Sequence, residues 1–194
     1  MTINLEKGAR INLSKEAPGL IKVRAGLGWD ANTFDTGGDF DLDVSLFALA
    51  PDAGGNPKLL DDKYFVFYNN KNTPDGAVAH LGDARKGEVS GDDETLTIDL
   101  SKLNPRVEEL SIIVTIHDAA TRRQNFGQVR NSYIKLYDDA TGAVLAKYAL
   151  EDDFSTETAV QFGSLFKKEG QWLFKAVGAG YKKGLNDFVS AYLS

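Results

Sequence analysis

The chain has 194 residues, a formal net charge of −6, 42% apolar residues and no cysteine. This composition is typical of a globular domain, and it excludes disulfides, thiolate nucleophiles and cysteine-ligated metal sites. The acidic balance argues against a nucleic-acid-binding surface. No apolar run approaches the roughly 18–20 residues that a membrane span needs, and the first residues show no secretory signal. We therefore expect one domain over residues 1–194, without direct membrane insertion.

Short strands are predicted along most of the chain. Runs rich in β-branched and aromatic residues alternate with clusters of Gly, Asp, Asn and Pro, which mark turns. In chain order, the predicted strands cover residues 11–14, 20–28, 41–50, 64–68, 95–100, 110–117, 132–138, 143–150, 159–167 and 171–177. Residues 138–142 and Gly170 are expected in hairpin turns. So many short strands indicate a sandwich or a barrel.

Two helices are expected at the periphery of these strands. Residues 184–194 place apolar side chains at the helical spacing i, i+3, i+4, i+7 and i+8, which predicts one core-facing stripe. A second, shorter helix is expected within residues 119–129 and ends near Gly127.

Recognised catalytic motifs are missing from the sequence. There is no G-x-S-x-G, H-E-x-x-H or P-loop pattern, and the spacing of the glycines in AVGAGYKKG (176–184) does not fit a dinucleotide fingerprint, so we assign them to turns. His80 is expected in a polar loop and His117 at the end of a strand. Nothing marks a particular nucleophile, and we expect no enzymatic activity.

Acidic residues are clustered near the predicted strand ends. In GGDFDLDVS (37–45), strand alternation places Asp39, Asp41 and Asp43 on one face and apolar residues on the other. Like charges on one face repel, unless a cation lies between them. An oxygen-rich ligand set favours calcium over magnesium. The EF-hand pattern is broken at Val44 and Ala50, so a calcium site has to be assembled from separate loops.

Seven blocks stand out along the sequence, namely GLGWD (26–30), FDLDVS (40–45), FVFYNN (65–70), GDDE (91–94), VTIHDA (114–119), RRQNFGQV (122–129) and STETAVQFGSLFKKEGQWLFKAVGAGY (155–181). In this order they resemble the TerD family, which is associated with tellurite resistance and general stress in bacteria. The resemblance covers nearly the whole chain and is closest to the single-domain TerD and TerE proteins. Two departures are Val44, where the family commonly has Ala, and Phe154, where it usually has a small residue.

The resemblance implies a mainly β fold, namely a β-sandwich of two mostly antiparallel sheets with short peripheral helices and a C-terminal helix. It also implies a cytoplasmic protein that binds Ca²⁺, with more than one ion expected, and that acts with other Ter proteins and a membrane partner, TerC. Carried over from the family's acidic motifs, the implied metal ligands are Asp39, Asp41, Asp43, Asn69, Asn70, Asp92, Asp93, Glu94, Asp118, Glu151, Asp152 and Asp153, with Glu157 as a weaker candidate.

Two other functions stay open at this point. A carboxylate-dependent hydrolase needs a concave pocket and a group with a shifted pKa. A small-anion or nucleotide binder could use Arg122, Arg123 and Gln124, although a solvated helix face also explains the arginine pair. Tellurite itself is an anion and is a poor direct ligand for an anionic cluster.

Overall fold

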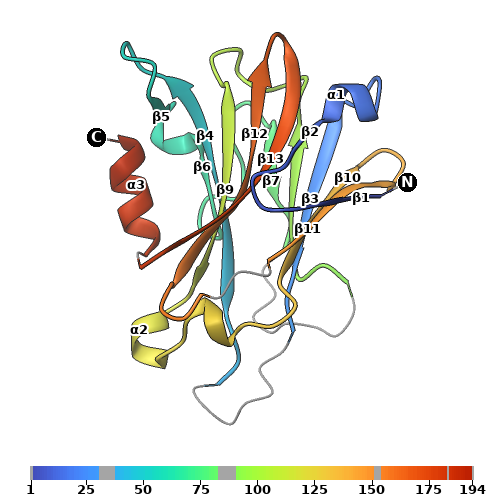
Figure 1. The fold of residues 1–194 in the computed structure, drawn as a ribbon. Helices are drawn as coiled ribbons and strands as arrows, with labels where there is room; N and C mark the ends of the chain where they lie inside the picture. The colour runs from blue at the N-terminus through green and yellow to red at the C-terminus, as the bar shows by residue number, and fades with distance from the viewer. Residues whose placement is uncertain (1, 31–37, 83–90, 151–153, 183, 194) are drawn as a thin grey trace.

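The computed structural model describes all residues except 1, 31–37, 83–90, 151–153, 183 and 194, and it forms a sandwich of two β-sheets (Figure 1). The first sheet, sheet A, has the order β1 (Ile3–Leu5), β11 (Val144–Ala149), β10 (Tyr133–Asp138), β3 (Lys22–Gly28), β8 (Glu94–Asp99) and β7 (Val78–His80). The second sheet, sheet B, has the order β2 (Arg10–Asn12), β13 (Gln171–Tyr181), β12 (Ala159–Lys168), β9 (Glu109–Ile116), β4 (Leu42–Pro51) and β5 (Pro57–Leu59), with β6 (Phe65–Val66) also paired to β4. The predicted mainly β sandwich is therefore confirmed.

Pairing is antiparallel between the described strands, except that β1 runs parallel to β11. The sheets enclose a core of aliphatic and aromatic side chains. In β4, Leu42, Val44 and Leu46 belong to this core, whereas Phe47 and Leu49 point to the outside of sheet B and join a second apolar cluster. This alternation is the period-2 pattern that the sequence predicts.

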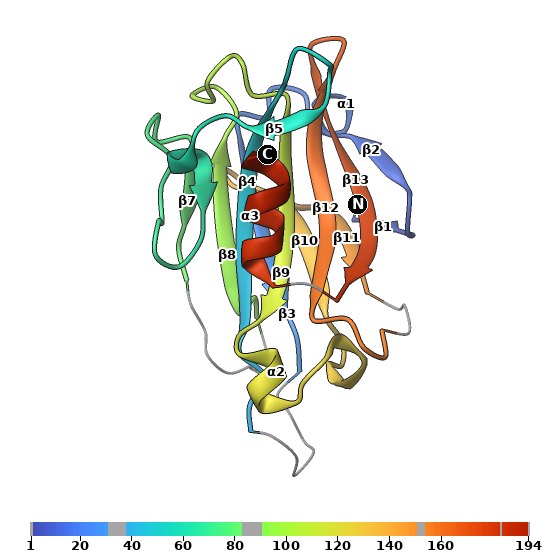
Figure 2. The same cartoon turned by 90° about the vertical axis from the view of Figure 1, so that its left-hand side faces the viewer.

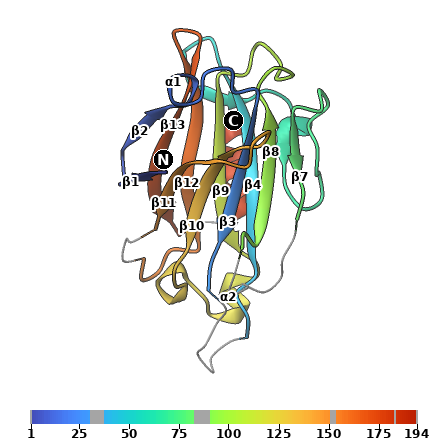
Figure 3. The ribbon, with the colours of Figure 1, turned by 90° about the vertical axis from the view of Figure 1, so that its right-hand side faces the viewer.

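The described helices lie outside the two sheets. They are α1 (Leu13–Glu16), α2 (Ala119–Arg122) and α3 (Leu185–Leu193), with 3₁₀ turns at Asp62–Tyr64 and Phe126–Gln128. Helix α3 lies across the outer face of sheet B (Figure 2), where Phe188 packs against Tyr181. The opposite view shows the strands of sheet A with no described helix over them (Figure 3). None of the described helices is long and apolar enough to cross a membrane.

Several expectations from the sequence are wrong. The helix expected to end near Gly127 already ends at Arg122, where Arg123 takes a left-handed backbone with φ 53°. The strand expected at 11–14 ends at Asn12, because the Asn12 side chain accepts a hydrogen bond from the Lys15 N–H and starts α1. Strand β13 continues to Tyr181, so residues 176–181 are paired strand instead of turn, with a bulge where Gly178 has φ +57°. His80 is not in a polar loop: it ends β7 and is only 4% exposed.

Phe154, the bulky departure from the family pattern, is buried and packs edge-on against Phe126. Space for its ring comes from Gly180, where an added Cβ would approach the ring to 2.4 Å. The short strands β1, β5 and β7 were not predicted, because three-residue runs carry too little periodicity to be recognised.

Candidate functional site

Most of the acidic clusters gather at one end of the sandwich. Strand pairing fixes this, because Leu27 at the end of β3 is opposite Glu94, and Leu42 at the start of β4 is opposite Ile116 at the end of β9. Residues 39–43, 92–94 and 118 therefore all flank strand ends at the same pole, which is the lower end in Figure 1. We call this the acidic pole.

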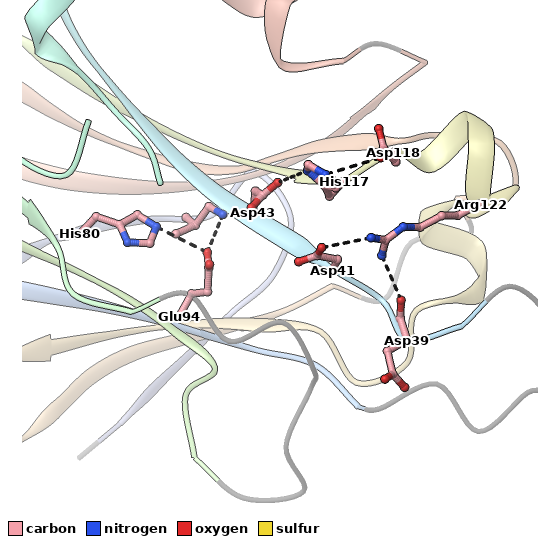
Figure 4. Close-up of polar contacts among 9 residues, drawn as sticks. Asp39, Asp41, Asp43, His80, Glu94, His117, Asp118 and Arg122 are labelled. Atoms are coloured by element: carbon pink, nitrogen blue, oxygen red, sulfur yellow. Dashed lines mark hydrogen bonds and ion pairs between the residues drawn. The ribbon is translucent and has the colours of Figure 1, made fainter. Parts of the chain in front are cut away.

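Asp41 and Asp39 face helix α2 across the pole (Figure 4). The guanidinium of Arg122 lies 3.3 Å from Oδ2 of Asp41 and donates to the carbonyl oxygen of Asp39 at 3.4 Å. Gln124, 3% exposed, donates from its side-chain amide to the carbonyl oxygen of Gly38 at 3.0 Å. These contacts hold the segment that leads into β4 against α2.

Asp43 and Asp118 lie on either side of His117 (Figure 4). Nδ1 of His117 is 3.4 Å from Oδ2 of Asp43, and Nε2 is 3.6 Å from Oδ2 of Asp118. Asp43 is only 8% exposed, whereas Asp118 is exposed and adopts a left-handed backbone with φ 49°. The three residues line a hollow of about 520 Å³ that reaches the start of α3 at Asp187.

Asp93 and Glu94 turn inward between the sheets and hold backbone amides. Oδ2 of Asp93 accepts from the Trp29 N–H at 2.9 Å. Oε2 of Glu94, 1% exposed, accepts from the Val44 N–H at 2.5 Å and lies 3.8 Å from Nε2 of His80. Glu94 therefore links β8 of sheet A to β4 of sheet B.

Asp92 faces the outer side of sheet A, away from this interior. Its two carboxylate oxygens accept from the hydroxyls of Tyr133 at 3.1 Å and Tyr137 at 2.7 Å. Arg24 at 3.6 Å and Lys135 at 3.7 Å add opposite charge. Burial, followed by the neighbouring Asp92 carboxylate, raises the pKa of both tyrosines, so both stay protonated as donors.

The remaining candidates lie elsewhere. Asn70 donates from its side chain to the carbonyl oxygens of Lys63 and Phe65, closing the turn after β6, and Asn69 is exposed in the same turn. Glu157 accepts from the Thr156 N–H at 3.0 Å, which lowers its pKa. Glu151, Asp152 and Asp153 fall outside the described residues.

The donor set at the acidic pole suits a hard cation, because it consists of carboxylate and carbonyl oxygens. Asp41, Asp43 and Asp118 come from the paired ends of β4 and β9, and their described partners include the side chains of Arg122 and His117. Asp92, by contrast, is saturated by two hydroxyls and two cations. Among the residues that the structure describes, no group of three or more Asp, Glu or His side chains stands close enough to hold a metal ion.

Two residues at the pole were not predicted to belong to the site. His117 was expected only as a strand-end residue, yet it contacts two of the predicted acids. Asp187 lines the same hollow from α3, about 70 residues further along the chain. The adjacent His-Asp pair at the end of an apolar strand was the available sequence signal for His117, whereas no local pattern marks Asp187.

Comparison with known proteins agrees with this fold. The TerD domain matches residues 1–192. The tellurium resistance protein TerD of Serratia marcescens is 47% identical over 192 residues, covering 99% of this chain and 97% of that protein. General stress protein 16U of Bacillus subtilis is 44% identical over 192 residues, with the same coverage of both chains.

A solved structure supports the same relationship. The crystal structure of a homologue of telluride resistance protein TerD from Streptomyces coelicolor A3(2) has a TM-score of 0.70 and 25% identity, over 88% of this chain and 96% of that chain. Both sequence and fold therefore lead to one conclusion: the chain belongs to the TerD family, whose named members include tellurium resistance and general stress proteins.

Proposed function

We propose that this protein is a calcium-binding member of the tellurium resistance and stress-response family, which acts through Ca²⁺-dependent contacts with other proteins. The observation that supports it is the gathering of Asp41, Asp43 and Asp118 at one pole, on paired strand ends. Carboxylates gathered at one pole favour a bound cation, which would have to draw these three closer together than the described structure places them. Family membership supports the link to tellurite and other chemical stress.

Within this proposal, the carboxylates of Asp41, Asp43 and Asp118 are the first ligands, with the carbonyl oxygen of Asp39 as a neighbouring donor. A bound calcium ion would supply positive charge and oxygen coordination there. Arg122 and His117 then release the acids they contact in the free protein. Glu151, Asp152 and Asp153 remain predicted ligands from the sequence.

The proposed partners are other Ter proteins and a TerC-type membrane protein, with the protein itself in the cytoplasm. A change of charge at the acidic pole gives calcium a way to control such contacts, because the acids, α2 and the start of α3 share one surface. The anion-binding alternative gains no support, since Arg122 is engaged by Asp41 and Gln124 by the carbonyl oxygen of Gly38.

Thermal unfolding of chelator-stripped protein, titrated with Ca²⁺ and separately with Mg²⁺, tests the proposal. Calcium at a hundredfold excess over Kd should stabilise the fold by about 2.7 kcal/mol. We expect Asp41→Asn and Asp43→Asn to lose most of this gain. Glu16→Gln, an exposed position on α1 at the opposite end of the sandwich, removes the same charge and should keep it (Figure 1). An equal response to both ions, or an unchanged response in the Asp variants, would contradict the proposal.

A further inference from the structure

A second hollow lies on the outer face of sheet B, beside α3. It measures about 440 Å³, which is within the range of small-molecule sites. Its walls come from β2, β13, β12 and β9, and one rim is the hairpin between β4 and β5. Figure 2 views this face, with β12 and β13 uncovered to one side of α3.

The floor of the hollow carries polar side chains from three neighbouring strands, and Ser111 on β9 lies next to it in the same row. Ser111 on β9 is opposite Ser164 on β12, Ser164 is opposite Lys175 on β13, and Lys175 is opposite Arg10 on β2. Ser111 and Ser164 are 0% and 4% exposed. Tyr192 of α3 contacts Ser111, but no described helix covers β12, and a hydroxyl as deeply buried as that of Ser164 is unusual for a merely solvated surface.

A hydrogen-bond network fixes this floor in place. Gln161 donates from its side-chain amide to Ser111 at 2.9 Å and to Ser164 at 3.2 Å. Ser164 in turn donates to Oε1 of Glu109 at 2.6 Å, and the Tyr192 hydroxyl of α3 donates to Ser111 at 3.3 Å. Since both bonds of Gln161 use its nitrogen, the acceptors left over are its carbonyl oxygen and the Glu109 carboxylate. The floor is therefore preorganised and acceptor-rich at the β9 side.

Opposite charges line the two sides of the hollow without neutralising each other. Glu109 lies at the β9 side, and Lys175 and Arg10 lie at the β13 and β2 side. Within the described part of the chain, neither Glu109 nor Lys175 has an oppositely charged side-chain group within 4.0 Å, and the Arg10 guanidinium lies over the Phe166 ring at 5.8 Å. A ligand that carries both charges can satisfy both sides at once.

We propose that this hollow binds a short linear zwitterion, of which a dipeptide with free termini is the simplest example. Its ammonium group lies at Glu109 and Gln161, and its carboxylate lies at Lys175 and Arg10. The dimensions agree. β9 and β13 are two strand spacings apart, and Lys175 is two residues along β13 from the position level with Glu109, which gives a diagonal of about 12 Å between the two residues. An extended dipeptide spans at most about 7 Å of this distance. The long side chains of Lys175 and Arg10 cover the remaining distance.

Binding of L-alanyl-L-alanine to the whole protein, measured by calorimetry and ligand-detected NMR, tests the proposal. The comparison peptides are N-acetyl-alanyl-alanine, which lacks the ammonium group, and alanyl-alanine amide, which lacks the carboxylate. We expect each to bind at least about tenfold more weakly than the free dipeptide, the loss that a missing charged hydrogen-bond partner causes. No dipeptide binding at millimolar concentration, or equal affinity for all three peptides, would overturn the proposal.

Variants assign each end of the ligand. Glu109→Gln should remove the preference for a free ammonium group and keep the preference for a free carboxylate, and Lys175→Gln should do the reverse. Lys168→Gln changes an exposed lysine on β12 outside the hollow and should bind as the wild type does. Unchanged preferences in both hollow variants would show that the peptide binds elsewhere. Each measurement is made with calcium and with chelator, so that it is independent of the acidic pole.

Discussion

Glu94 is a buried carboxylate that reaches from one sheet to the other. Its neighbours in β8, Leu96 and Ile98, face the core, and Glu94 shares their side of the strand. Its acceptor role matters because β4 pairs with β6 only from Leu46 onward, so the Val44 N–H has no strand partner on that edge. A buried backbone N–H needs an acceptor, which Glu94 provides.

Replacing Glu94 with Ala should therefore destabilise the protein strongly. We expect the free energy of unfolding to fall by about 3 kcal/mol, the cost of leaving the partners of a buried charge unpaired. Urea unfolding in chelator measures this without a contribution from metal. Glu16→Ala, at an exposed position, serves as the control, and a loss no larger than in that variant would refute this role of Glu94.

Asp75 gives the fold a dependence on acid pH. Burial raises its pKa, but hydrogen bonds from the Thr73 hydroxyl and from the N–H groups of Ala77 and Asn104 outweigh this and leave the pKa below the usual 3.8. A lowered folded-state pKa means that the carboxylate stabilises the fold above pH 3.8, and that this contribution is lost as the pH falls through the folded-state value.

For Asp75→Asn, we expect the stability deficit relative to wild type to be largest near pH 7 and to shrink as the pH falls below 3.8. Urea midpoints between pH 7 and pH 3 provide the measurement, with Glu16→Gln matching the change in charge. A deficit that stays constant over this range would rule out the linkage.

At the scale of elements, helix α3 could be predicted from the local spacing of its apolar residues alone. Its apolar stripe is confirmed at four of the five predicted positions, because Leu185, Phe188, Val189 and Tyr192 face the cluster around Phe47 and Ile113 on sheet B. The fifth, Leu193, is 52% exposed, so the prediction was wrong there. The alternation in residues 39–43 also holds, since Phe40 and Leu42 are buried. Helical and strand periodicity can be read directly from the sequence because each is set within a few residues.

Other features could not be predicted, because they depend on pairing between distant segments. The tyrosines that hold Asp92 are more than 40 residues away in the sequence. Strand β13 continues past its glycines because β12 pairs with it as far as Tyr181. The free energy of this pairing is not part of the local turn preference that the sequence shows. The inward orientation of the Glu94 side chain likewise depends on the Val44 N–H, which lies on an unpaired edge of β4 in sheet B.

Helix α3 should be held by packing instead of by its own helix propensity, since nine residues are too few for a stable isolated helix. Phe188→Ala should cost about 3 kcal/mol and release α3 from the sheet. Hydrogen exchange should then be faster in α3 than in β9 and β12, whereas Asn186→Ala on the exposed side should leave exchange unchanged. Equal protection of α3 in both variants would contradict this account.

At the scale of the whole molecule, the first strands connect the two sheets at one edge. β1 adds to sheet A beside β11, and β2 adds to sheet B beside β13. The segment between them contributes a hydrogen bond from the Gly8 N–H to the Ala176 carbonyl oxygen. Both sheets should therefore unfold as one unit.

Deleting residues 2–6 should lower the unfolding midpoint of both sheets equally, by about 2–4 °C per kcal/mol lost. Trp29, beside β3 of sheet A, and Trp172, in β13 of sheet B, are both buried and can report each sheet in single-tryptophan variants. Ile21→Ala, at a side chain that is 56% exposed, is the control. Separate transitions for the two tryptophans would show that the strands do not couple the sheets.

The distance in sequence between β1 and β11, and between β2 and β13, also delays the pairing of the first strands during synthesis. Ile3 pairs with Ala146, and Arg10 pairs with Lys175. The first strands to leave the ribosome therefore cannot pair until nearly the last strands have been synthesised. At roughly 5–20 residues per second, that delay is on the order of ten seconds. For most of this time β10 and β11 of sheet A and β12 and β13 of sheet B are still missing, so a large part of the apolar core stays uncovered. Nascent chains of this protein are therefore expected to depend on chaperones until translation is almost finished.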